Sequence, residues 1–157
     1  MNKALNYALY LFKFRPRSEY ELSQRLQERG ISKRAISQVV ISLRKNGLIN
    51  DFEFAKAWVE SRIKKPLGFR RLRQELKLKG VKNEIISQVF SLFNDRYSEE
   101  EVIKGVVSRR QELLRNIPPE KAKQRIFLYL MRRGFSAGQI REVISQCFKA
   151  DKKSAYF

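Results

Sequence analysis

Arginine and lysine side chains that could bind phosphate groups are the residues of this chain best suited to chemistry. The densest basic stretch runs from residue 62 to residue 82 and contains a single acid, Glu75. Its basic members are Arg62, Lys64, Lys65, Arg70, Arg71, Arg73, Lys77, Lys79 and Lys82. In a helix, Arg70, Arg73 and Lys77 follow one line at i, i+3 and i+7, beside a line of apolar residues. Such a line can contact successive phosphates of a nucleic acid.

The same line also has a structural interpretation, in which long alkyl stems cover the core and the charged ends are solvated. We favour binding, because compensating Asp and Glu are missing from this face.

Basic clusters recur elsewhere, at Arg15 and Arg17, at Arg44 and Lys45, and at Arg132 and Arg133. The last two pairs also suit helix C-termini, where each cation contributes about 0.3–1 kcal/mol.

Residues that usually perform catalysis are scarce. Histidine is absent and Cys147 is the single cysteine, which removes the commonest general base, His-bearing zinc sites and internal disulfides. No glycine-rich phosphate loop or dinucleotide-binding pattern occurs. The run Glu99 to Glu101 begins a predicted helix, where acids complement the helix dipole. We therefore predict no catalytic residue, no metal site and no cofactor, and a protein that binds rather than reacts.

The net charge of the chain indicates its class of partner. With 34 basic and 16 acidic residues among 157, it is +18 at pH 7, well above the roughly 2–8 that solubility needs. Such a chain attracts polyanions, and nucleic acid is the first candidate. No run approaches the roughly 18 apolar residues that span a bilayer, and the first residues lack a cleavage-like site. We expect a cytoplasmic protein with no membrane partner.

A pattern that occurs three times must position these cations. Every member keeps the same offset from its glycine, and the glycines lie about 50 residues apart, which indicates tandem structural repeats. The copies are Leu22, Leu26, Gly30, Ile31, Ile36, Val39, Val40 and Leu43; Leu72, Leu76, Gly80, Val81, Ile86, Val89, Phe90 and Phe93; and Ile126, Leu130, Gly134, Phe135, Ile140, Val143, Ile144 and Cys147.

Each copy has the spacing of a helix, a turn and a second helix, with the glycine as the left-handed residue after the first helix. A further helix precedes each pair, at residues 2–13, 51–64 and 98–114, and proline follows it at Pro16, Pro66 and Pro118–Pro119. Ser18 and Glu21 match a capping box. We expect the other helix caps at Ser32, Asp51, Asn83, Ser98 and Ser136.

These signals predict an all-α fold of three tandem three-helix repeats, at residues 1–50, 51–97 and 98–157, with a frayed end from Ala150. Aromatic residues at core spacing, including Phe54, Trp58 and Phe90, are interpreted as packing rather than as base-stacking platforms. Cys147 replaces Leu43 and is interpreted as a core residue. A helix-turn-helix that reads bases is not supported, because no copy has a recognition helix that starts with Asn, Gln and Arg.

The middle of the chain resembles the RecX family of recombination regulators. The segment Asn50-Asp51-Phe52-Glu53-Phe54-Ala55-Lys56-Ala57-Trp58-Val59 is followed by Arg62, by Gly68-Phe69-Arg70-Arg71-Leu72 and by Glu75-Leu76-Lys77-Leu78-Lys79-Gly80-Val81. The first residues fit as well, with Ala4-Leu5, Ala8-Leu9, Arg15, Arg17, Ser18, Glu21-Leu22 and Leu26. The resemblance covers almost the whole chain, and the third repeat diverges most.

The resemblance implies an elongated, curved regulator that binds the RecA filament on single-stranded DNA, as a monomer and without enzymatic activity. Proteins of this family lie along the filament groove and inhibit the ATPase, strand-exchange and coprotease activities of RecA in DNA repair and the SOS response. The alternative is a nonspecific binder of single- or double-stranded DNA. From charge density, we expect the binding residues to be Arg15, Arg17, Arg62, Lys64, Lys65, Arg70, Arg71, Arg73, Lys77, Lys79, Arg132 and Arg133.

Overall fold

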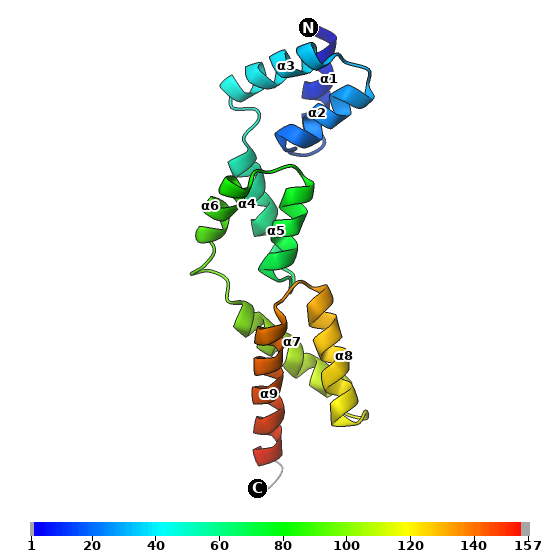
Figure 1. Ribbon diagram of the computed structural model, residues 1–157, viewed down its shortest axis with the longest axis vertical. Helices are drawn as coiled ribbons and strands as arrows, with labels where there is room; N and C mark the ends of the chain where they lie inside the picture. Colours follow the sequence, from blue (N-terminus) through cyan, green and yellow to red (C-terminus); the bar gives the residue numbers. More distant parts are fainter. Residues whose placement is uncertain (1, 155–157) are drawn as a thin grey trace. The chain divides into compact units, whose positions relative to one another are not determined.

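Nine α-helices and no β-strand form residues 2–154, which are the residues that the computed structural model describes (Figure 1). The helices are α1 (Asn2–Phe12), α2 (Glu19–Glu28), α3 (Lys33–Lys45), α4 (Asp51–Arg62), α5 (Phe69–Leu78), α6 (Asn83–Ser91), α7 (Glu99–Leu113), α8 (Pro119–Arg132) and α9 (Ala137–Ser154). They confirm the prediction of an all-α fold built from three-helix repeats. The frayed end expected from Ala150 stays a prediction, because α9 continues to Ser154 and residues 155–157 lie outside the described part.

The chain divides into two compact units. The first unit contains the residues up to Ser61 together with Gln74–Leu92, and the second contains Arg62–Arg73 together with the residues from Phe93 onward. The division passes through α5, so the middle repeat contributes residues to both units.

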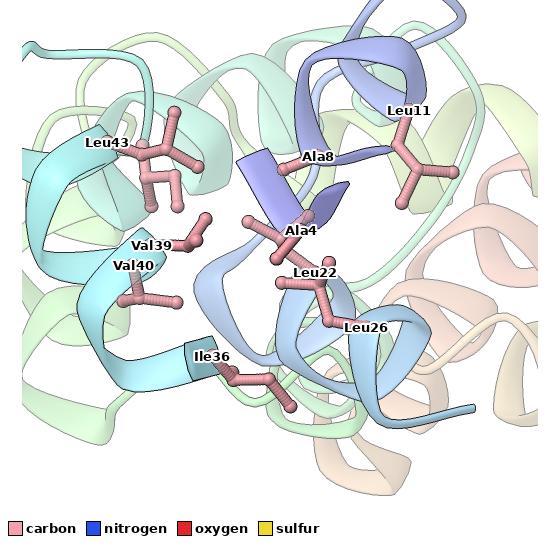
Figure 2. Close-up of a cluster of buried hydrophobic side chains, with 10 residues drawn as sticks. Ala4, Ala8, Leu11, Leu22, Leu26, Ile36, Val39, Val40 and Leu43 are labelled. Carbon is pink, nitrogen blue, oxygen red and sulfur yellow. The ribbon is translucent and has the colours of Figure 1, made fainter. Parts of the chain in front are cut away.

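The first repeat has a core of small and branched side chains. In Figure 2, Ala4 and Ala8 of α1 face side chains of α2 and α3, and both alanines are almost fully buried. The residues of this core are Ala4, Ala8, Leu11, Leu22, Leu26, Ile36, Val39, Val40, Leu43 and Ile49. Small residues on α1 allow α2 and α3 to approach it closely, and the predicted apolar positions of the first copy supply six of these ten buried residues.

The third repeat has an equivalent core between α7, α8 and α9, which pack against one another (Figure 1). Its buried residues are Ile103, Val106, Val107, Ile126, Leu130, Phe135, Ile140, Val143 and Ile144. Cys147 is half-buried against this core. The thiol thus occupies an apolar position, as the repeat pattern predicts.

The turn glycines have the conformation that the pattern predicts. Gly30, Gly80 and Gly134 have φ angles of 78°, 73° and 88°, and Gly47, which follows α3, has 67°. Side chains with a Cβ rarely adopt this left-handed region. The turns therefore end their helices for a local reason that can be read from the sequence.

Two predicted caps are wrong, while the serine caps are confirmed. Ser18 and Glu21 form a complete capping box, and Ser32 and Ser98 accept a backbone N–H as expected. Asn50, rather than Asp51, caps α4, since its Oδ1 accepts from the N–H groups of Phe52 at 3.0 Å and Glu53 at 3.2 Å.

The second wrong cap is Asn83, which is the first residue of α6 instead of its cap. Lys82 occupies the cap position with an extended backbone and makes no side-chain cap. The reason is the alignment of the repeats, which places Lys82 at the position held by Ser32 and Ser136. Ser136 does cap α9, accepting from the N–H of Gln139 at 3.3 Å.

Consecutive repeats are connected by a recurring set of hydrogen bonds, which we call the repeat joint. In the first unit, the N-cap Ser18 donates its Oγ–H to the carbonyl of Lys79 at 2.5 Å. The N–H of Glu19 donates to Oδ1 of Asp51 at 2.8 Å. Asp51 therefore ties the start of α2 to the start of α4, which explains why it does not cap its own helix.

The second unit contains the same joint at equivalent positions. The N–H of Gly68 donates to the carbonyl of Arg133 at 2.9 Å, and the N–H of Phe69 donates to Oε1 of Glu99 at 2.7 Å. Gly68 precedes Leu72 by the same four-residue offset with which Ser18 precedes Leu22. A Cβ on Gly134 would lie 2.7 Å from the backbone nitrogen of Arg71, so the turn needs glycine for space as well as for φ.

Candidate nucleic-acid and filament interface

The line of cations on α5 lies opposite a fully buried apolar line. Leu72 and Leu76 are both 0% exposed, whereas Arg70 and Lys77 are exposed and make no ion pair within the described residues. Arg73 is half-buried between them and has an interaction partner. The helix therefore presents Arg70 and Lys77 to solvent, as a phosphate-binding line requires.

A second basic site lies in the second unit, where the connection between α4 and α5 meets α7. Lys64 and Lys65 line a shallow pocket of about 280 Å³ with Arg109 and Gly105 of α7. Arg62, which ends α4, is half-buried. Glu101 also borders this pocket, and its carboxylate pairs with Lys104 at 3.2 Å. Cations thus outnumber acids on the pocket wall.

Arg71, Arg132 and Arg133 come together at the second repeat joint. Nη1 of Arg71 donates to the carbonyl of Arg132 at 3.2 Å, and the carbonyl of Arg133 accepts from Gly68. Arg71 lies 61 positions before Arg132 along the chain, so the fold brings together charge that the sequence keeps separate. Arg132 and Arg133, at the end of α8, also stabilise that helix terminus.

Two predicted binding residues instead form an internal ion-pair network in the first unit. Arg15 pairs with Glu21 through two hydrogen bonds of 2.9 and 3.1 Å, and Nζ of Lys79 lies 2.9 Å from the same carboxylate. The ammonium group of Lys79 also lies 4.1 Å from the ring centroid of Trp58, a cation–π contact.

Electrostatics and burial act in opposite directions on Glu21. Burial alone would raise its pKa, but hydrogen bonds from Arg15 and Lys79 and their charges outweigh burial and lower the pKa to about 2. The carboxylate is therefore charged at neutral pH and stabilises both cations. Arg15 and Lys79 remain expected binding residues, although a phosphate would have to compete with Glu21 for them.

Arg17 is half-buried beside Arg15, and its Nε has no hydrogen-bond partner among the described residues. Burial, together with the nearby charges of Arg15 and Arg25, lowers its pKa. It borders a pocket of about 430 Å³ with Phe12 and Phe54. The side chain is consequently less accessible than the spacing around Pro16 suggested.

Charge-density reasoning missed a cluster on the third repeat. The guanidinium carbon of Arg110 lies 3.4 Å from the ring centroid of Tyr129, and that of Arg133 lies 5.0 Å from it. The adjacent Arg109 and Arg110 late in a predicted helix were the available signal, as for Arg132 and Arg133. Tyr129 carried no signal, because an aromatic residue next to Leu130 has ordinary core spacing.

In residues 2–154, no group of three or more His, Cys, Asp or Glu side chains could hold a metal ion. None of the described helices is long and apolar enough to cross a membrane.

Comparison with known proteins gives consistent matches along the chain. Models of the RecX first, second and third three-helix domains match residues 4–43, 50–89 and 98–144. The regulatory protein RecX of Streptomyces coelicolor is 34% identical over 137 residues, which cover 87% of this chain and 72% of the relative. That of Haemophilus influenzae is 29% identical over 144 residues, which cover 91% and 93%. The crystal structure of RecX from Lactobacillus salivarius shares the fold, with a TM-score of 0.81 at 22% identity over 92% of this chain and 94% of that one.

The helices, the turns and the exposed cations define a basic all-helical protein of tandem three-helix repeats. The three domain matches and the named relatives specify the class further. The chain belongs to the RecX family of regulatory proteins.

Proposed function

We propose that this protein binds the RecA filament assembled on single-stranded DNA and modulates its activity, with inhibition of the recombinase, ATPase and coprotease functions as the expected direction. It acts by binding alone, as a cytoplasmic monomer, and catalyses no reaction. Membership of the RecX family carries this proposal. The distribution of charge supports it.

Several acids of the chain are used inside the fold. Glu21, Asp51 and Glu99 hold the repeat joints or their neighbouring cations. Glu75 accepts a hydrogen bond from the indole of Trp58 at 3.0 Å. Because these carboxylates are occupied, much of the positive charge stays on the surface, where it can meet the phosphates of the filament.

The exposed cations occur in more than one repeat. Lys64, Lys65, Arg70 and Lys77 belong to the second repeat, and Arg132 belongs to the third. Similar units that each make weak contacts to a repetitive partner gain affinity together, since later contacts are effectively intramolecular. A helical filament of identical protomers is such a partner.

Titration of the protein into a RecA–single-stranded DNA ATPase assay tests the proposal. At physiological salt and at protein concentrations well below that of RecA, we expect the ATPase rate to fall. Such loss cannot come from coating the DNA, because too few molecules are present. An ATPase rate that changes only when the protein saturates the DNA would contradict the proposal and favour nonspecific DNA binding.

Substitution of the α5 line tests the site. We expect the triple variant Arg70→Gln, Arg73→Gln, Lys77→Gln to keep its helicity but to require a higher concentration for the same inhibition. The matched control removes three exposed charges from α3 by Lys33→Gln, Arg34→Gln and Lys45→Gln. Equal inhibition by both variants would show that α5 contributes only general charge.

The alternative function is nonspecific binding of nucleic acid, with effects on RecA as a consequence. The net charge of +18 favours it, since unbalanced charge binds any polyanion. The two functions differ in how steeply binding weakens as the salt concentration rises.

A further inference from the structure

Two guanidinium groups converge on one phenol in the third repeat. Arg110, from the last turn of α7, and Arg133, which follows α8, lie 3.4 and 5.0 Å from the ring centroid of Tyr129. All three residues are half-buried, and the ring packs against the core of the third repeat. The ring is therefore held in position by the core, while each of the three residues keeps part of its surface exposed. We call these residues the Tyr129 cluster.

The charge of the Tyr129 cluster is not neutralised by a neighbouring acid. Neither Arg110 nor Arg133 forms an ion pair within the part of the chain that the structure describes. Acids on α7 already have other cations as partners, since Glu112 pairs with Arg115 at 3.2 Å and both Glu100 and Glu101 pair with Lys104. The two positively charged guanidinium groups thus lie against the same neutral tyrosine ring.

The pKa of Tyr129 is affected by the positive charge around it. Burial would raise its pKa, but hydrogen bonding from Arg110 and the charges of Arg133 and Arg110 outweigh burial, so the pKa lies below its usual value. Negative charge is therefore favoured at the position of the phenol oxygen. An anion bound beside that oxygen would experience the same field.

Helix termini and cation–π contacts explain these arginines only in part. Each guanidinium near a helix C-terminus contributes about 0.3–1 kcal/mol, and each contact with an aromatic ring contributes about 0.5–2 kcal/mol. A single arginine at a helix C-terminus, or a single arginine on an aromatic ring, would be enough for each of these contributions. Convergence of two arginines on one ring brings their charges together, which is unfavourable unless an anion joins them.

We propose that Arg110, Tyr129 and Arg133 form a phosphate-binding site that takes a phosphodiester group of single-stranded DNA. Two guanidinium groups and a phenol O–H supply donors for several oxygens of one phosphate, and guanidinium matches that geometry in a bidentate way. Arg71 and Arg132 continue the positive charge, because Nη1 of Arg71 donates to the carbonyl of Arg132. A polyanion suits this extended charge better than a single carboxylate of a protein.

The site deepens the proposed function, on which it rests for its role in the filament, but its binding step is measured without RecA. Fluorescence anisotropy of a labelled oligothymidylate would give the affinity and its salt dependence. We expect Arg110→Gln and Arg133→Gln each to weaken binding several-fold and to reduce the slope of log affinity against log salt by about 0.7. Tyr129→Phe, which removes a donor but no charge, should weaken binding and leave the slope unchanged.

A matched control and a structural readout separate binding from folding. Arg34→Gln removes the same charge from an exposed arginine of the first unit and should change affinity less than Arg110→Gln. Melting temperatures should stay within a few degrees of the unmodified chain. Affinity of Arg110→Gln and Tyr129→Phe equal to that of the control would overturn the proposal.

Other anions give different outcomes. If the variants bind DNA normally but lose inhibition of RecA, the site takes a protein carboxylate and the phosphodiester assignment is wrong, while the proposed function stands. If inorganic phosphate at constant ionic strength stabilises the unmodified chain and DNA affinity is unchanged in the variants, the ligand is a free anion and the assignment is again wrong. If DNA affinity falls as expected but the unmodified chain does not affect RecA, the phosphate site stands and the proposed function fails.

Discussion

Glu21 connects local and distant parts of the first unit. Its carboxylate completes the capping box by accepting from the N–H of Ser18 at 3.3 Å, and it pairs with Arg15 and Lys79. Its side chain is only 17% exposed, so these contacts are weakly screened by solvent. One acid therefore stabilises a helix terminus and an adjoining repeat at the same time.

The pKa of Glu21 predicts a pH-dependent contribution to stability. Because its folded pKa is about 2, below the ordinary 4.5, the ionised side chain stabilises the fold above about pH 4.5. This contribution is lost as the pH falls through about 2. We expect Glu21→Gln to lower the free energy of unfolding by about 2–3 kcal/mol at pH 7. Urea unfolding of both proteins from pH 2 to pH 7 measures this difference.

The comparison removes the general effect of acid on a strongly basic chain, since both proteins accumulate the same remaining charge. The difference between them should shrink toward zero at pH 2. Glu28→Gln is the control, because Glu28 makes only an exposed i,i+3 pair with Arg25 and should change stability by less than about 0.5 kcal/mol. A constant difference between Glu21→Gln and the unmodified chain at every pH would show that packing, rather than charge, is lost.

The sequence predicted the local half of this network but not the distant half. Ser18 and Glu21 are three residues apart, and their capping box follows from helix geometry. Lys79 lies 58 positions from Glu21, and only the packing of one repeat on the next brings them together. Charge density therefore selected Lys79 as a binding residue without indicating that an acid already occupies it.

At the scale of helices and turns, the repeat joint explains why glycine is needed at Gly134 for two reasons. The left-handed φ excludes most residues from all three equivalent turns. At Gly134, an added Cβ would also meet Arg71, with 2.4 Å to its Cβ, whereas at Gly30 nothing lies within 4 Å. The need for a left-handed φ is thus common to the three turns, whereas the lack of space for a Cβ at Gly134 arises from the repeat joint.

The two turns allow the steric cost of the joint to be measured. We expect Gly30→Ala to destabilise the fold by about 1–2 kcal/mol, from the left-handed backbone alone. Gly134→Ala should cost about 2–5 kcal/mol, because overpacking against the backbone of Arg71 adds to that strain. Denaturant unfolding of both variants provides the comparison. Equal losses of stability would show that the second joint relaxes freely around an added methyl group.

Helices and turns were predictable to within a few residues, because their signals are local. Asn50, Asp51 and Glu99 are positions at which local signals are not enough to predict the contacts. Sequence rules favoured Asp51 as a cap, but its carboxylate is committed to Glu19 at the joint, and Asn50 caps α4 in its place. Tertiary contacts between repeats decide such cases, and no single-repeat pattern contains them.

At the scale of the whole molecule, the repeats determine how charge is distributed. Each repeat buries one apolar face, and each joint uses acids that would otherwise neutralise surface cations. Composition fixes the net charge, and the tandem arrangement influences how much of the positive charge on the surface is left without an acidic partner. The sequence predicted that arrangement through its recurring glycines, but it could not identify the convergence of Arg110 and Arg133 on Tyr129, which depends on how α7 packs on α8.

The dependence on salt should separate filament regulation from general DNA binding. If six to ten phosphates are contacted, raising salt from 50 to 200 mM should weaken binding to bare single-stranded DNA by roughly 300-fold to 10⁴-fold. A regulator that also contacts RecA keeps part of its affinity, because contacts between proteins depend less on counterion release. We therefore expect inhibition of preassembled filaments to weaken much less than the affinity for bare DNA over this range, because partly buried contacts are screened less by salt. Parallel measurement of ATPase inhibition and of DNA affinity at each salt concentration makes the comparison, and the same steep loss in both assays would favour the nucleic acid as the sole partner.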